Sequence, residues 1–287
     1  MGSSPPASRP RLAVAVGDPR GIGPEVVRKA LRQPLDADVR IVGGWEDSVP
    51  NDVEAGRVAA QSIESAARLA LSGEVDAIVT GPVNKSSLHA AGYRFPGVTE
   101  FLAHVAGDIP VAMMLTTGRL RVVLVTTHLS LRDAIASVTT DRVVAAGRIA
   151  IEALQQWWGI STPRVALCAM NPHAGEGGLF GDDDDRLLKP AAAALDAAGP
   201  LPADTVFVRA LRGEFDAVLA PYHDVGMTAV KVSGFGTGVN VTLGLPFIRT
   251  SPDHGTAFDI AGKGIADAGS MRASLELAVQ LAHARRA

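Results

Sequence analysis

Short apolar runs recur along the chain, and glycine or proline follows them within two residues. Examples are residues 12–16, 39–42 and 75–79. They are rich in β-branched side chains and do not alternate strictly with polar residues, which is typical of strands buried on both faces of a sheet. The pattern therefore predicts several buried strands, each ending in a tight turn.

Alanine-rich segments with the period of a helix lie between these runs. A strand, a glycine turn and a helix in repeated succession indicate an α/β fold with a mainly parallel sheet. We find no linker between domains. A second domain must therefore share its sheet with the first, or the chain must cross between the two domains twice. The alanine-rich segments are residues 25–32, 56–71, 141–157, 186–197 and 270–282.

Three of the seven histidines directly follow apolar runs. The pairs are residues 121–127 with His128, 164–172 with His173, and 215–222 with His223. If these strands are parallel, their carboxyl ends share the edge at which open α/β sheets bind ligands. Three imidazoles there would leave coordination positions open for substrate, as in catalytic metal sites. Nitrogen ligands favour zinc or another late transition metal.

The other interpretation is that each of these histidines is a hydrogen-bonded loop residue, which is the commoner role of a single histidine at a strand end. Three at equivalent positions favour the metal site. His89, His104 and His283 fall on predicted helices, and we interpret them as surface or packing residues.

Charge and composition exclude some classes of function. The net charge is −3, so the basic surplus typical of nucleic-acid-binding proteins is absent. No apolar stretch reaches the roughly 20 residues of a membrane span, and residues 1–10 lack the apolar core of a signal peptide. We expect a cytoplasmic protein with no nucleic-acid or membrane partner. The single cysteine, Cys168, lies in an apolar run and is predicted to be buried.

Glycine-rich segments mark candidate ligand loops. Residues 17–25 (GDPRGIGPE) do not match the Rossmann fingerprint, so they form either a tight turn or an anion contact. Residues 171–178 surround His173, and the acidic run 182–185 after them is interpreted as helix capping rather than a calcium site. Residues 234–240 lie between Lys231 and Arg249, a combination that can bind a phosphate or carboxylate. Residues 253–267 are either a connector or a ligand-wrapping loop.

Long motifs in the chain resemble the 4-hydroxythreonine-4-phosphate dehydrogenase family of vitamin B6 biosynthesis and its paralogues. The resemblance extends from Gly17 to about Leu281. The motifs are GDPRGIGPE at 17–25, TGPVNK at 80–85, THLSLRD at 127–133, NPHAGEGG at 171–178, YHD at 222–224 and GVNVTLGLPFIRT at 238–250.

The resemblance implies two α/β/α domains with a mainly parallel sheet, similar to isocitrate and isopropylmalate dehydrogenases. Residues 1–94 plus 251–287 would form the cofactor-side domain, and residues 95–250 the domain for metal, substrate and dimerisation. It also implies a homodimer whose active site takes residues from both subunits.

The resemblance also assigns residues to roles. The metal ligands would be His128, His173 and His223, the three that the strand pattern indicates. The substrate contacts would be Thr99, Lys231, Asn240 and Arg249. The cofactor loop would contain His254, Gly255, Thr256, Ala257, Asp259 and Asp267. Asp224 and Lys85 are the two candidates for the base, and the alternative role of Lys85 is to bind the phosphate or a carboxylate.

The reaction implied is oxidation of a phosphorylated β-hydroxy acid by NAD, with NADP as an alternative, followed by loss of carbon dioxide. A divalent metal would lower the pKa of the substrate hydroxyl and polarise the ketone. Zinc is expected, with manganese, cobalt, nickel or magnesium as alternatives.

Two departures from the family pattern bear on the substrate. The family has Gly-His-Thr-Glu where this chain has Val98 within GVTE, and a valine side chain cannot donate a hydrogen bond. The chain also lacks a few tens of residues between Trp45 and Gly56. Retention of Lys231, Asn240 and Arg249 favours a phosphorylated substrate, and we expect 4-hydroxythreonine 4-phosphate or an analogue such as 4-phosphothreonate or 4-phosphoerythronate. The alternatives are a dihydrodiol-dicarboxylate dehydrogenase of aromatic catabolism, a non-catalytic metabolite-binding paralogue and a metallohydrolase.

Overall fold

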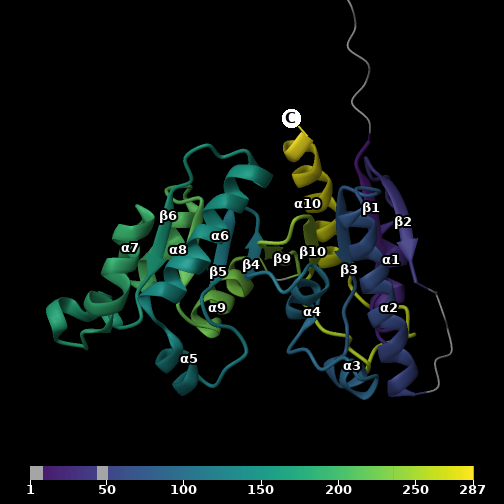
Figure 1. Ribbon diagram of the computed structural model, residues 1–287, viewed down its shortest axis with the longest axis horizontal. Coiled ribbons are helices and arrows are strands. Elements are labelled where there is room, and N and C mark those ends of the chain that lie inside the picture. Colours follow the sequence, from purple (N-terminus) through teal and green to yellow (C-terminus); the bar gives the residue numbers. More distant parts are fainter. Residues whose placement is uncertain (1–8, 44–50, 235, 287) are drawn as a thin grey trace, which may run out of the picture. The chain divides into compact units, whose positions relative to one another are not determined.

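The computed structural model describes residues 9–43, 51–234 and 236–286 (Figure 1). It divides into unit 1, Met1–Phe95 with Pro246–Ala287, and unit 2, Pro96–Leu245. The chain therefore leaves unit 1 and returns to it. The boundaries after residues 95 and 245 lie one and five residues from the expected ones, after 94 and 250. Residues 1–8 and 44–50 lie outside the described residues. They include most of residues 1–10, for which we expect no signal peptide, and part of the stretch between Trp45 and Gly56, which is shorter than in the family.

Unit 1 contains a parallel sheet in the order β2-β1-β3-β10. Three of its strands, β1, β3 and β10, are almost wholly buried, as expected for strands covered on both faces. The strands are β1 (Arg11–Ala15), β2 (Asp38–Val42), β3 (Ala77–Thr80) and β10 (Ile248–Pro252). The helices are α1 (Gly23–Ala30), α2 (Asp52–Leu71), α3 (Lys85–Ala90) and α10 (Gly269–Arg286).

Local sequence explains where these helices begin. Pro24 lies in the first turn of α1, where a missing N–H costs nothing. The Asn51 side chain caps α2 by accepting a hydrogen bond from the N–H of Glu54 at 3.0 Å. The side chain of Asn84 caps α3 in the same way, by accepting from the N–H of Ser87.

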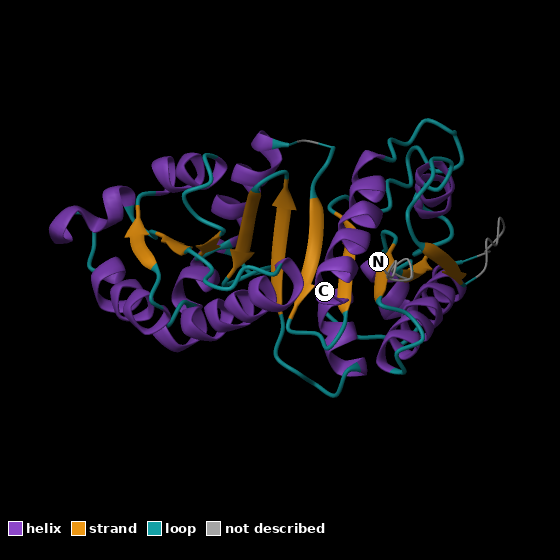
Figure 2. Ribbon diagram, turned by 90° about the horizontal axis from the view of Figure 1, so that it is seen from above, coloured by secondary structure: helices purple, strands orange, loops and turns teal. Residues whose placement is uncertain are grey.

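Unit 2 contains a mixed sheet in the order β9-β4-β5-β8-β6-β7. Figure 2 shows strands with helices on both sides of them. Strands β5, β8, β6 and β7 are parallel, whereas β4 is antiparallel to β5 and β9. The strands are β4 (Ala112–Thr117), β5 (Leu120–Leu124), β6 (Val165–Cys168), β7 (Ala198–Leu201), β8 (Ala217–Ala220) and β9 (Val239–Leu243). The helices are α4 (Val98–Val105), α5 (Leu131–Ser137), α6 (Thr140–Trp158), α7 (Lys189–Leu195), α8 (Ala203–Leu211) and α9 (His223–Ser233). The predicted mainly parallel α/β fold is confirmed.

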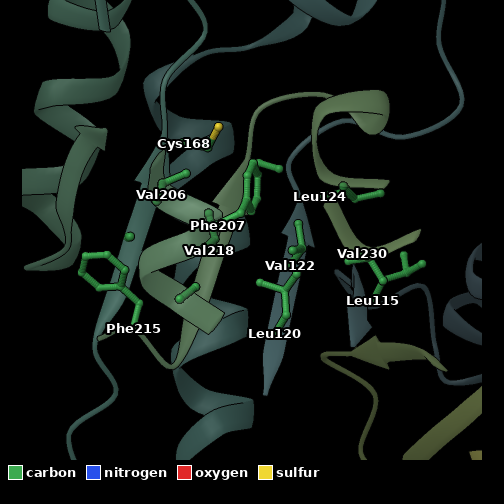
Figure 3. Close-up of a cluster of buried hydrophobic side chains, with 13 residues drawn as sticks. Leu115, Leu120, Val122, Leu124, Cys168, Val206, Phe207, Phe215, Val218 and Val230 are labelled. Carbon is green, nitrogen blue, oxygen red and sulfur yellow. The ribbon is translucent and has the colours of Figure 1, made fainter. Parts of the chain in front are cut away.

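Helices cover both faces of the unit 2 sheet. On one face, Val122 of β5 and Val218 of β8 pack with Phe207 of α8 and Val230 of α9 (Figure 3). On the other face, Leu219 lies close to Gly147 of α6, where an added Cβ would be only 3.1 Å from the leucine side chain. This three-layer packing holds the ends of β5 and β8 at fixed positions.

Cys168, the single cysteine, belongs to the same core and is 1% exposed. Burial raises the pKa of its thiol to about 12, and the negative charge of Asp184 adds to the increase. A thiol of this kind is not a nucleophile at neutral pH. The prediction that Cys168 is a buried packing residue is confirmed.

Asp76 is expected to stabilise unit 1 in a pH-dependent way. Burial opposes its ionisation, but hydrogen bonds from Arg11 and Arg286 outweigh this and lower its pKa from 3.8 to about 2. A lowered folded-state pKa stabilises the fold above pH 4, and this contribution disappears as the pH falls through about 2. We expect Asp76→Asn to cost about 1–2 kcal/mol at pH 7.

Urea unfolding from pH 7 down to pH 2 measures this difference. Asp36→Asn is the control, since Asp36 pairs with Arg9 through side chains that are 68% and 60% exposed. A gap between wild type and Asp76→Asn that stays constant over the pH range would contradict the assignment.

Candidate functional site

His128 and His223 lie side by side at the carboxyl ends of β5 and β8. These strands are parallel neighbours, so the segments that follow them leave the sheet at the same edge. The two imidazole rings have centroids 5.8 Å apart and are tilted by 46°. They line a cavity of about 160 Å³ whose other lining residues are Thr127, Leu129, Leu131, Ala134, Tyr222 and Asp224.

His173 does not join this pair within the chain. Its ring packs edge-on against Phe180, with centroids 6.1 Å apart. The backbone from His173 to Gly177 is left-handed throughout, with φ between 44° and 80°, so the segment coils away from an ordinary strand-to-helix path. Among the described residues no three histidine, cysteine, aspartate or glutamate side chains are placed to hold a metal ion. One chain therefore assembles two of the three predicted ligands.

The imidazoles of His223 and His173 each have a carboxylate beside Nδ1. Nδ1 of His223 is 2.7 Å from Oδ1 of Asp224, and Nδ1 of His173 is 2.9 Å from Oε2 of Glu176. The hydrogen bond to Glu176 and its charge raise the pKa of His173. A carboxylate at Nδ1 fixes the tautomer and leaves Nε2 for a metal, which is the usual second contact of metal-binding histidines. The donor chemistry of both residues fits a zinc site.

The loop that carries His173 is held by a buried acid. Asp184 is 0% exposed, and its two oxygens accept hydrogen bonds from the backbone N–H groups of Met170 at 2.7 Å and Asn171 at 3.0 Å. The prediction that the acidic run caps a helix is wrong. Asp183, the N-cap residue of the short helix at residues 184–188, makes no side-chain cap hydrogen bond, and the Asp184 carboxylate is bonded to the backbone just after β6. The other three, Asp182, Asp183 and Asp185, pair at the surface with Arg186 or Lys189.

Three of the predicted substrate contacts lie in unit 2. Thr99, beside Val98 at the start of α4, is 6% exposed, and its hydroxyl is 3.4 Å from that of Thr242. Asn240 lies on β9, and its buried Oδ1 has no hydrogen-bond partner among the described residues. Lys231 is in the last turn of α9. The amide oxygen of Asn240 is available to a ligand.

Two further predicted residues belong to unit 1. Arg249 on β10 is 3% exposed, and its Nε and Nη2 donate to the hydroxyl of Thr80 at 3.1 and 2.7 Å. Thr80 begins the TGPVNK motif. Lys85, at the end of that motif, is exposed at the first residue of α3. Its role as a base stays a prediction, as does that of Asp224.

The predicted cofactor loop packs against the first glycine-rich segment. The N–H of Ile22 donates to the carbonyl of Thr256 at 2.9 Å, and a Cβ on Gly21 would lie 2.8 Å from Thr256. Gly21 is therefore required for close approach of the two segments. Nε2 of His254 is buried with no hydrogen-bond partner among the described residues, and the space around Gly255 is open. An orphaned ring nitrogen beside open backbone fits a bound cofactor.

The other predicted cofactor residues differ in exposure. Ala257 has a left-handed backbone with φ 41°, and Asp259 is exposed. Asp267 accepts a hydrogen bond from the N–H of Gly269 at 2.6 Å and so fixes the start of α10. No helix in the described part of the chain is long and apolar enough to span a membrane.

Comparisons with known proteins show the family of the chain. The family profile described as "Pyridoxal phosphate biosynthetic protein PdxA" matches residues 29–278. The chain is 44% identical to a 4-hydroxythreonine-4-phosphate dehydrogenase of Beijerinckia indica, over 94% of each chain. It is 42% identical to a D-threonate 4-phosphate dehydrogenase of Salmonella typhimurium, over 94% of this chain and 98% of the relative.

Solved structures show the same fold. A 4-hydroxythreonine-4-phosphate dehydrogenase from Klebsiella pneumoniae matches with a TM-score of 0.83 at 38% identity, over 95% of this chain and 99% of that one. Isocitrate dehydrogenase from Methylococcus capsulatus, at 16% identity and a TM-score of 0.51, covers 96% of this chain and 87% of its own, and shares the fold alone. The chain belongs to the PdxA family of dehydrogenases.

Proposed function

We propose that this protein is a metal- and NAD-dependent dehydrogenase that oxidises and decarboxylates a phosphorylated β-hydroxy acid. The observation that carries the proposal is the His128–His223 pair at one sheet edge, with Asp224 fixing the tautomer of His223. The substrate is 4-hydroxythreonine 4-phosphate, 4-phosphothreonate or 4-phosphoerythronate. The names of the relatives support the first two members of this class.

His128, His173 and His223 would hold a divalent cation, with zinc favoured by the nitrogen donors. When bound, such a cation supplies a Lewis acid that lowers the pKa of a substrate hydroxyl and stabilises the developing negative charge. Because Asp224 is already bonded to Nδ1 of His223, we assign it to orienting that imidazole. Lys85 then remains as the candidate that removes the hydroxyl proton.

A second copy of the chain would complete the metal site with its own His173. The His173 side chain is 63% exposed, and Leu179 and Phe180 beside it are 73% and 44% exposed. The cavity at His128 and His223 is rimmed by Leu129 and Leu131, which are 48% and 61% exposed. Exposed apolar side chains therefore lie both beside His173 and beside the His128–His223 pair. This supports a two-fold homodimer in which the two apolar surfaces are covered.

The 253–267 loop would bind NAD or NADP. His254 and Gly255 offer an orphaned nitrogen and an open backbone, and Thr256 is fixed from behind by Ile22. The bound nicotinamide would accept the hydride. Thr99, Lys231, Asn240 and Arg249 would bind the substrate. Lysine and arginine suit its phosphate and carboxylate, whereas the orphaned Oδ1 of Asn240 can accept a hydrogen bond from a hydroxyl group.

Reduced cofactor should appear when the metal-loaded protein is mixed with NAD or NADP and one of the three phosphorylated acids. Absorbance at 340 nm measures it, and carbon dioxide release is followed in parallel. Protein treated with a chelator and substrates treated with phosphatase are the controls, and both should be inactive.

Absence of reduced cofactor with all three acids would contradict the proposal. Phosphate release without any cofactor would favour a metallohydrolase. Substrate binding without cofactor affinity would favour a non-catalytic metabolite-binding protein.

A further inference from the structure

The loop formed by residues 253–267 has little packing of its own. Apart from the adjacent residues in the chain, no heavy atom of the described residues lies within 4 Å of a Cβ placed on Gly255, Gly262 or Gly264. Phe258 and Ile265 are 44% and 66% exposed. Glycine-rich backbone with exposed side chains loses much conformational entropy when it is ordered. The loop has backbone hydrogen bonds of its own from Ile260 to Ala257 and from Lys263 to Ile260, and contacts from outside the loop add to them.

Two side chains of α1 bind the end of this loop. Glu25 accepts hydrogen bonds from the N–H groups of Gly264 at 3.2 Å and Ala266 at 2.8 Å. Lys29 donates to the carbonyl oxygens of the same two residues, at 2.9 and 2.8 Å. The two side chains are one helical turn apart and pair with each other at 2.8 Å. Together they satisfy both backbone polar groups of Gly264 and of Ala266.

These contacts are stronger than ordinary surface pairs. The Glu25 and Lys29 side chains are only 14% and 28% exposed, and hydrogen bonds to charged groups are roughly twice as strong as neutral ones. The bond from Lys29 is the largest cause of a lowered pKa for Glu25, and the N–H groups of Ala266 and Gly264 add to it against the cost of burial. Glu25 is therefore held as a carboxylate.

The segment just before α1 contacts the loop at two more points. Ile22 donates its N–H to the carbonyl of Thr256 at 2.9 Å, and the guanidinium of Arg20 lies 5.5 Å from the ring centroid of Phe258. Anchors at residues 256, 258 and 264–266 span most of the loop. Of these anchors, only the Glu25–Lys29 pair combines a fixed charge with several hydrogen bonds.

We propose that Glu25 and Lys29 are positioning residues that hold the 253–267 loop in its cofactor-binding shape before the cofactor arrives. The inference rests on the proposed function, which gives this loop to NAD or NADP. Ordering a loop on binding costs affinity, and a loop that is already ordered avoids that cost. The pair touches no reacting atom in this scheme, so it should affect cofactor affinity rather than the chemical step.

The variant Glu25→Gln tests the proposal, since it keeps one oxygen acceptor but loses the other and the charge. Without cofactor, hydrogen exchange at the amides of Gly264 and Ala266 should speed up about 10-fold. Calorimetry should show a Kd for the cofactor raised about 10-fold, which corresponds to the loss of one charged hydrogen bond. The kcat at saturating cofactor and the KM for the phosphorylated acid should stay within about twofold.

Two further variants make the result specific. Glu276→Gln is the matched control, because Glu276 also forms an i,i+4 pair in unit 1, with Arg272 at 2.7 Å, and is 56% exposed. It should leave both the amide exchange and the cofactor Kd unchanged. Lys29→Met removes the two carbonyl contacts by a different route and should act in the same direction as Glu25→Gln, whereas Lys29→Arg should retain wild-type affinity.

The outcomes separate this inference from the proposed function. Unchanged amide exchange in Glu25→Gln, or faster exchange with unchanged cofactor affinity, would overturn the inference. If the wild type binds neither NAD nor NADP, the proposed function is wrong, together with the cofactor part of the inference. The amide exchange then still decides whether Glu25 fixes the loop.

Discussion

Mixing two inactive variants, His173→Ala and His223→Ala, should restore about a quarter of wild-type activity once the subunits have exchanged. In the proposed homodimer each site takes His128 and His223 from one subunit and His173 from its partner. A heterodimer of the two variants then has one intact site of two. Random assembly makes half of the dimers heterodimers. Because half of the sites in each heterodimer are intact, a quarter of all active sites are intact.

Each single variant should lose activity almost completely. Removal of one of three ligands removes the metal and the charge stabilisation that it provides, so we expect kcat/KM to fall roughly a thousandfold or more. Bound zinc per subunit, measured by atomic absorption, should fall in parallel. His104→Ala is the control for losing a histidine, because His104 pairs with Asp108 on the surface of α4 and its side chain is 56% exposed.

A second mixture makes the test decisive. His128 and His223 are assembled by the same chain, so a heterodimer of His128→Ala and His223→Ala has no intact site and should stay inactive. Recovery in this mixture, or none in the mixture with His173→Ala, would contradict a shared site. Co-expression with two affinity tags isolates the heterodimers and measures them directly.

The apolar runs predicted the parallel strands well because buried strands leave a direct mark on the sequence. Strands β1, β2, β3, β5, β6 and β8 lie within a few residues of the predicted runs. Strands β4, β7, β9 and β10 were not predicted. β7 (Ala198–Leu201) is half-exposed and contains a glycine and a proline, so no apolar run marks it.

The pairing of His128 with His223 followed from the sequence because β5 and β8 are parallel neighbours. The place of His173 did not, since it depends on backbone dihedral angles rather than on a hydrophobic pattern. His173, Ala174 and Glu176 are non-glycine residues with φ of 53°, 56° and 44°, which such residues seldom adopt. Only the neighbouring glycines hint at this conformation. The sequence alone therefore could not show that His173 lies apart from His128 and His223 within one chain.

The roles of Asp184 and Glu25 were also hidden in the sequence. Four consecutive aspartates look alike, and burial alone separates Asp184 from its neighbours. Glu25 resembles an ordinary acidic residue in a first helical turn, and the loop that it binds is more than two hundred residues away along the chain. Contacts at that separation are set by the fold and leave no periodic signal.

Asp184→Ala is expected to destabilise the protein by about 2–4 kcal/mol, the cost of leaving two N–H groups at the end of β6 without their acceptor. Asp184→Asn keeps one acceptor oxygen and should cost about half as much. Asp185→Asn is the matched control. Asp185 pairs with Lys189 at 2.6 Å through a side chain that is 45% exposed, so its loss should change the free energy of unfolding by less than about 0.5 kcal/mol.

Because Asp184 bonds to the two residues that precede Pro172 and His173, the same change should also loosen the His173 loop. Urea unfolding gives the stability, and limited proteolysis reports cleavage within residues 172–181. Asp184→Ala should be cut several times faster than Asp185→Asn under conditions in which both are folded, since the loop would open without global unfolding. Equal stability and equal cleavage rates for the two variants would show that the buried carboxylate does not hold this loop. The left-handed turn would then have to be maintained by its own residues.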